Sequence, residues 1–84
     1  MGKYEPITRY LLGVRADEVR VSFADLEAIL GFSLPESARL YSAWWANESD
    51  GRHSQCRSWI DVGWKTFALD LNNRFVYFRK IGGD

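Results

Sequence analysis

The chain has 84 residues, with 11 basic and 11 acidic side chains, so its formal net charge is zero. Its composition is 46% hydrophobic and 15% aromatic, which excludes an intrinsically disordered chain and is sufficient for one domain over residues 1–84. Apolar runs of only a few residues exclude a transmembrane helix, and the charges in the first ten residues argue against a signal peptide.

A short helix and a short strand are predicted at the start of the chain. Pro6 suits the first turn of a helix, where its missing amide costs nothing, and Gly13 can end that helix. We therefore predict a helix over residues 5–12. Apolar and charged residues then alternate over residues 19–21, which predicts a brief, half-buried strand.

Two further helices are predicted in the middle of the chain. Ser22 begins a capping-box pattern, and the apolar stripe that follows it ends at Gly31, which predicts a helix over residues 23–30. A second capping pattern begins at Ser33 and is followed by apolar residues at helical spacing. This pattern predicts a third helix over residues 35–46.

The last third of the chain predicts a fourth helix followed by a β-hairpin. A capping serine at its start predicts that the helix covers residues 54–62. After this helix the apolar period changes to two, which predicts strands over residues 64–71 and 74–79. Between the strands, Asn72 and Asn73 predict a type I′ turn, because asparagine tolerates positive φ.

This order of elements predicts an α+β, winged-helix-like domain with three to four short helices, a short strand and a C-terminal hairpin. Two short helices joined by a turn containing Gly31, with apolar Leu40 placed to pack back, indicate a helix-turn-helix. The hairpin would be the wing, and residues 79–84 are expected to form a flexible tail. In such a fold one helix enters the major groove while the wing contacts the backbone or the minor groove.

The neutral net charge conceals an uneven distribution along the chain. Residues 1–50 hold five basic and eight acidic side chains, whereas residues 51–84 hold six basic and three acidic ones. Phosphate binding depends on a local basic face and not on the total charge. Neutrality therefore does not exclude nucleic acid as a partner.

We predict from these patterns a non-catalytic DNA-binding module, a small regulator or accessory factor. Arginine and glutamine side chains can read guanine and adenine edges, and helix N-termini attract phosphates. The candidate contacts are Ser37, Arg39, Arg52, His53, Ser54, Gln55, Arg57, Lys65 and Arg74. Some of these residues could instead have purely structural roles. Arg39 could pair with Glu27 or Glu36, and Ser54 could simply cap a helix.

The alternative is a protein–protein interaction domain, with a homodimer as one form of it, that uses an exposed tryptophan patch or the hairpin edge. Adjacent side chains on a helix point about 100° apart. Trp44 and Trp45 can therefore both be buried only if the helix is covered on two sides. We expect Trp45, Trp59 and Trp64 in the core, and Trp44 either in the core or at an interface.

Catalysis has little support in the sequence. A hydrolase using His53 and Cys56 is the third alternative, but no third group that would orient them is evident. Cys56 falls on an apolar stripe, and His53 has no second histidine with which to hold a metal. We therefore expect no enzyme, no cofactor and no metal. The single cysteine cannot form an internal disulfide, which fits a reducing, cytoplasmic setting.

Several short motifs are typical of one family: Leu30-Gly31-Phe32, Leu34-Pro35, Ser37-Ala38-Arg39, Ala43-Trp44-Trp45 and Gly63-Trp64. Over roughly residues 4–79 the chain resembles a small bacterial and phage-associated domain family of unknown function. The resemblance brings no activity with it. It implies that one patterned surface contains Ser37, Arg39, Trp44, Asn47, Ser54 and Gln55.

Overall fold

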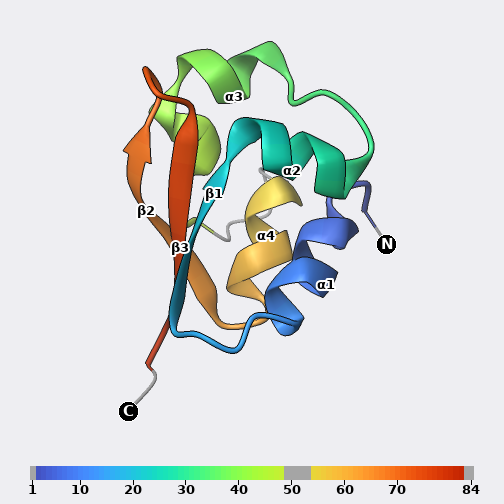
Figure 1. The fold of residues 1–84 in the computed structure, drawn as a ribbon, viewed down its shortest axis with the longest axis vertical. Coiled ribbons are helices and arrows are strands. Elements are labelled where there is room, and N and C mark those ends of the chain that lie inside the picture. The colour runs from blue at the N-terminus through green and yellow to red at the C-terminus, as the bar shows by residue number, and fades with distance from the viewer. Residues whose placement is uncertain (1, 49–53, 83–84) are drawn as a thin grey trace.

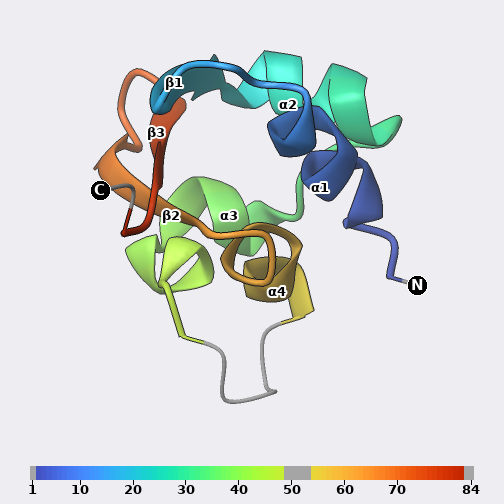
Figure 2. The ribbon, with the colours of Figure 1, turned by 90° about the horizontal axis from the view of Figure 1, so that it is seen from below.

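The computed structural model describes residues 2–48 and 54–82. In chain order its elements are α1 (Glu5–Leu12), β1 (Glu18–Ser22), α2 (Phe23–Leu30), α3 (Glu36–Leu40), the 3-10 helix η1 (Ser42–Trp45), α4 (Ser54–Ile60), β2 (Trp64–Asp70) and β3 (Phe75–Lys80). The strands form an antiparallel sheet in the order β1-β3-β2 (Figure 1). The helices lie on one side of this sheet, and within the described residues no helix covers its other face (Figure 2). The predicted α+β class is confirmed.

Helices α1 and α2 begin and end where the local sequence predicts. Ile7 and Leu11 are the buried residues of α1. At the start of α2 the Ser22 hydroxyl accepts a hydrogen bond from the Asp25 amide at 3.0 Å. Gly31 ends α2 in the left-handed conformation, with φ of 84°. Capping by Ser22 and Gly31 therefore places α2, whereas α1 begins without a side-chain cap and Gly13 at its end is right-handed, with φ of −90°.

The predicted helix over residues 35–46 is wrong beyond Leu40. The chain is extended at Tyr41, with φ of −127° and ψ of 128°, and η1 begins immediately after it. The break allows the Trp45 indole to donate to the Ala38 carbonyl at 2.8 Å. Trp44 and Trp45 are both buried because η1 is covered on two sides, Trp44 packing against Tyr4 and Trp45 against Phe23.

The predicted packing of Leu40 against the preceding helix is also wrong. Leu40 is 54% exposed, and Leu34 and Ala38 are buried instead. The connection between α2 and α3 is fixed by the Glu27 carboxylate, which accepts from the Leu34 amide at 2.8 Å and pairs with Arg39. The Glu27–Arg39 ion pair and the hydrogen bond from the Leu34 amide to Glu27 therefore help to position α3, whereas the Leu40 side chain is exposed.

The hydrophobic core lies between the helices and the inner face of the sheet. Its largest fully buried side chains include Trp59, Phe23 and Phe78, and the predicted burial of Cys56 is confirmed. Trp45, Trp59 and Trp64 also lie in the core, as predicted. Helix α4 supplies much of this core, and it ends at Ile60, two residues before its predicted end.

The turn of the hairpin is longer than the predicted type I′ turn. Asp70 and Phe75 form the last pair, so four residues make the loop. Among the described non-glycine residues φ is positive only at Ala68 and Arg74, whereas a type I′ turn needs positive φ at both central residues. The Asp70 carboxylate accepts from the backbone amide and the side chain of Asn73, each at 2.9 Å. These two hydrogen bonds hold the longer loop.

A β-bulge in β2 changes which side chains face the core. Between the pairs Phe67–Tyr77 and Asp70–Phe75, two residues of β2 stand opposite one residue of β3. The extra residue is Ala68, in the left-handed region with φ of 49°. The bulge reverses the alternation, so that Leu69 packs against the core.

The predicted flexible tail from residue 79 is wrong at its start. Arg79 and Lys80 belong to β3, where they pair with Lys65 and Trp64 of β2. Beyond the strand, the Ile81 amide donates to the Gly63 carbonyl at 2.7 Å. Residues 83–84 lie outside the described residues.

Candidate nucleic-acid interface

The nine predicted nucleic-acid contacts lie on different parts of the molecule. Arg52, His53 and the side chain of Ser54 lie outside the described residues. The other six are Ser37 and Arg39 on α3, Gln55 and Arg57 on α4, Lys65 on β2 and Arg74 in the hairpin turn. Of these six, only Lys65 and Arg74 belong to the sheet and its hairpin.

Gln55 is a structural residue, and its predicted role in reading bases is wrong. It is 6% exposed, and its Nε2 donates to the Trp44 carbonyl at 3.0 Å. A side chain held in this way cannot reach a base edge. Within residues 55–60 of α4 only Arg57 is exposed, so this helix presents almost nothing to a DNA groove.

The two predicted contacts on α3 have different surroundings. Arg39 is bound to Glu27, and both side chains are partly buried, as the ion-pair explanation predicts. Ser37 is exposed and lines a hollow of about 310 Å³ together with Tyr41, Trp44 and Gln55. Arg39 is therefore engaged within the protein, while Ser37 stands at the edge of an apolar hollow.

The alternative interface built on an exposed Trp44 is wrong. Trp44 is 9% exposed, and its ring lies 5.7 Å from that of Tyr4 and 4.7 Å from that of Trp45, centroid to centroid. The burial of Tyr4 raises the pKa of its hydroxyl. Trp44 contributes to the lining of the hollow that it shares with Ser37.

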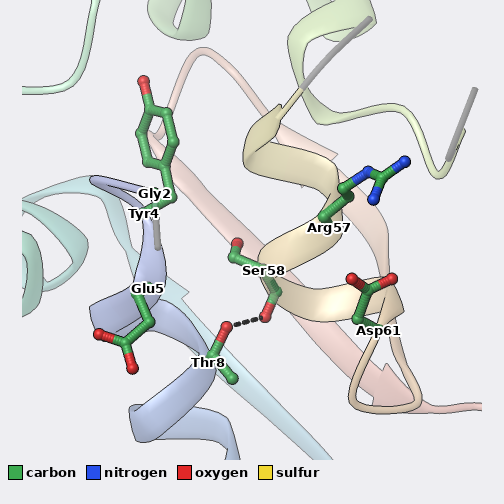
Figure 3. A pocket seen from close by; sticks show the side chains of 7 residues that line it. All are labelled: Gly2, Tyr4, Glu5, Thr8, Arg57, Ser58 and Asp61. Atoms are coloured by element: carbon green, nitrogen blue, oxygen red, sulfur yellow. Dashed lines mark hydrogen bonds between the residues drawn. The ribbon is translucent and has the colours of Figure 1, made fainter. Parts of the chain in front are cut away.

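Arg57 lies in a polar hollow of about 320 Å³ between α1 and α4 (Figure 3). Glu5 lines this hollow from α1, and Asp61 follows α4 on the same side as Arg57. The Thr8 hydroxyl crosses between the two helices and donates to the Ser58 carbonyl at 2.7 Å. Arg57 thus shares this hollow with two carboxylates, Glu5 and Asp61, of which Glu5 is paired with Arg9.

At the predicted hairpin-edge interface, the backbone of Thr66 is already hydrogen-bonded within the chain. The Asn47 side chain donates through Nδ2 to the Thr66 carbonyl at 2.9 Å and accepts from the Thr66 amide at 2.8 Å. Its Oδ1 also accepts from the Trp59 indole at 3.0 Å. Of the surface that the family resemblance implied, Ser37, Trp44 and Gln55 line one hollow, while Asn47 is hydrogen-bonded to Thr66 of β2.

The sheet and its hairpin carry an excess of basic side chains. Within residues 18–22 and 64–80, five residues are basic and two are acidic, whereas the other described residues include five basic and seven acidic ones. The basic residues of these two segments are Arg20, Lys65, Arg74, Arg79 and Lys80; of them, Lys80 lies on the same face as its partner Trp64, with its Nζ 5.6 Å from the Trp64 ring centroid. The sheet side of the molecule is therefore the positively charged one.

Both acidic residues of the sheet side are engaged by neighbouring groups. Glu18 pairs with Arg79 at 3.3 Å, across the two strands. The side-chain and backbone hydrogen bonds from Asn73 hold the pKa of Asp70 below its ordinary value. Asp70 thus remains ionised, but its carboxylate is turned into the hairpin loop.

The outer face of the sheet also carries three aromatic side chains that sequence analysis did not single out. Phe67, Phe75 and Tyr77 are half-buried and do not belong to the buried core. In the sequence they stand two residues apart from one another or from a basic residue, at positions 65 and 67 on one strand and 75, 77 and 79 on the other. Residues spaced by two lie on the same face of a strand. The structure brings these residues to one face.

The comparisons with known proteins identify a family but no function. A family model described as a domain of unknown function (DUF7662) matches residues 4–81. No curated protein and no solved structure matches the chain. Within residues 2–48 and 54–82 there is no set of three or more side chains placed to hold a metal ion. In the same ranges no helix has the length and hydropathy that crossing a bilayer requires.

Proposed function

The chain belongs to the DUF7662 family of domains of unknown function, and we propose that it is a non-catalytic module whose sheet side binds nucleic acid. This proposal rests on the uneven distribution of basic and acidic residues between the sheet and the rest of the molecule. Five basic and two acidic residues lie on the sheet and hairpin, against five and seven on the rest of the described chain. Phosphates are attracted by such a local basic face, even when the total charge is zero.

The proposal includes a winged-helix arrangement in which the hairpin is the wing. Its support is that β1, which precedes α2, pairs with β3 of the hairpin, so that the strand and the wing form one sheet. Arg74 is exposed in the turn of this hairpin, and Lys65 projects from β2. We place the phosphate contacts on these side chains, because the helix directly before the hairpin, α4, is largely buried.

Salt-dependent binding tests this proposal. Fluorescence anisotropy with labelled mixed-sequence oligonucleotides would compare the wild type with a Lys65→Gln/Arg74→Gln variant. Each lost phosphate contact should lower the slope of log affinity against log salt by about 1 and weaken binding at low salt. The matched control is Arg9→Gln/Arg57→Gln, which removes two exposed charges from α1 and α4 and should leave the slope unchanged.

Two results would contradict nucleic-acid binding at the sheet side. One is the absence of binding to any oligonucleotide at low salt. The other is an equal loss of affinity in the control variant, which would show that the total charge matters and the sheet side does not.

A protein–protein interaction is the second candidate function, and exposed apolar side chains favour it. Leu40 and Tyr41 are 54% and 60% exposed, and Tyr41 borders the hollow lined by Ser37 and Trp44. Sedimentation of the wild type and of Tyr41→Ser over a range of concentrations tests the homodimeric form of this function. Association that Tyr41→Ser abolishes would support it, and a monomer at every concentration would exclude it.

A further inference from the structure

We infer that the ligand of the sheet side is single-stranded nucleic acid, with its bases stacked on Phe67, Tyr77 and Phe75. This inference rests on the proposed function and specifies its ligand. The residues that carry it are the aromatic side chains and arginines of the outer sheet face, which none of the helices in residues 2–48 and 54–82 covers (Figure 2).

The strand register brings the three rings together. Phe67 of β2 stands opposite Tyr77 of β3, and their ring centroids lie 5.2 Å apart. Phe75 lies two residues from Tyr77 on the same strand, with its centroid 5.8 Å from that of Tyr77. The rings therefore form a continuous row over two neighbouring strands. Rows of this kind offer stacking positions for about two or three bases.

Arginines lie over two of these rings, so a base that stacks on Phe67 or Phe75 takes the place of a guanidinium, which is then available to bind a phosphate. The Arg79 guanidinium lies 4.2 Å from the Phe67 centroid, and that of Arg20 lies 5.2 Å from the Phe75 centroid. Arg20 also stands directly opposite Tyr77 in the register of β1 and β3. Guanidinium groups can stack on a base as well as bind a phosphate. The same face thus provides both interactions that a nucleic-acid strand requires.

An unpaired strand fits this face better than a duplex or a protein. In a duplex the faces of the bases are covered by their neighbours, so aromatic side chains stack on bases that are unpaired. A protein partner would have to be acidic to match this face, whereas every nucleotide supplies a phosphate. The Arg79–Glu18 pair is exposed and costs little to open, so Arg79 can exchange Glu18 for that phosphate.

Replacing the aromatic rings by leucine tests the contribution of base stacking separately from that of charge. Anisotropy would measure the affinities of wild type, Phe67→Leu and Tyr77→Leu for single-stranded and duplex oligonucleotides of the same sequence, in DNA and RNA forms. Leucine keeps an apolar side chain on the sheet but removes the π-face. Each substitution should weaken single-strand binding about 5- to 150-fold, with the salt slope unchanged. Tyr41→Leu, which removes an exposed ring from the helical side, should have no effect on binding.

The outcomes distinguish this inference from the proposed function. Binding that depends on Lys65 and Arg74, but is unchanged in Phe67→Leu and Tyr77→Leu or is stronger for duplex, would overturn the inference and leave the proposed function standing. Absence of binding to either strand form would overturn both. Loss of self-association in Tyr77→Leu, without any effect on nucleic acid, would assign the face to a second copy of the chain. Circular dichroism would show that each variant is folded.

Discussion

The side-chain amide of Asn47 pairs with the backbone of Thr66 as a neighbouring strand would. It donates to the Thr66 carbonyl at 2.9 Å and accepts from the Thr66 amide at 2.8 Å. The Thr66 hydroxyl in turn donates to the Trp45 carbonyl at 2.6 Å, and the Trp59 indole donates to Asn47 Oδ1 at 3.0 Å. One asparagine therefore connects η1, α4 and the edge of β2.

Replacing Asn47 by alanine should destabilise the domain. The substitution removes the partner of the Trp59 indole and of the Thr66 amide, and unsatisfied groups of this kind cost about 1–3 kcal/mol. Urea denaturation of Asn47→Ala would measure the loss in free energy of unfolding. Asn72→Ala, in the exposed hairpin turn, is the control and should change it by less than about 0.5 kcal/mol. Equal effects of the two substitutions would contradict the structural role of Asn47.

Glycine at position 68 should stabilise the domain. Ala68 has φ of 49°, a conformation that costs an L-residue about 1–2 kcal/mol and costs glycine little. Ala68→Gly should therefore raise the free energy of unfolding by about 1 kcal/mol. Ala28→Gly, on the exposed face of α2, should lower it by about 0.5–1 kcal/mol. A loss of stability in both variants would show that Ala68 is not strained.

The hairpin turn should make stability depend on acid pH through Asp70. Hydrogen bonds from Asn73 lower the pKa of this carboxyl in the folded state. The stability it contributes is therefore present above the pKa of the unfolded chain and is lost as the pH falls through the lower pKa of the folded state. Unfolding of wild type and Asp70→Asn would be compared between pH 2 and 6. The difference should be larger at pH 6, and a constant difference would contradict this assignment.

Gln55 should contribute to stability and not to binding. Gln55→Leu leaves the Trp44 carbonyl without its donor in a buried place, which should cost about 1–3 kcal/mol. Thermal and urea unfolding would measure this cost, and anisotropy would measure nucleic-acid affinity under conditions where the variant is folded. Reduced affinity with unchanged stability would restore Gln55 as a base-reading residue.

The parts of the fold that depend on local interactions could be predicted from the sequence. Ser22 and Gly31 mark the two ends of α2 because a cap and a left-handed residue act within one turn. The break at Tyr41 could not be predicted, because it is stabilised by the hydrogen bond from the Trp45 indole to Ala38 and by the burial of two adjacent indoles. Helical spacing alone does not reveal such tertiary contacts.

The difference between local signals and tertiary contacts also decides which parts of the candidate site could be predicted from the sequence. Lys65 and Arg74 were predicted on the hairpin, and the structure places both there. The exposure of Gln55 could not be predicted, because its burial depends on Trp44, eleven residues away. Phe67 and Tyr77 follow a readable alternation, but only the pairing of β2 with β3 shows that their rings adjoin.

A titration of ¹⁵N-labelled protein with a single-stranded oligonucleotide tests the central claim most directly, because amide chemical shifts locate the contact surface. Nucleic-acid binding at the sheet side predicts progressive shifts in β1, β2, β3 and the hairpin turn, with little change in α1 and α3. An absence of shifts at low salt, or shifts confined to the hollow beside Tyr41, would contradict it.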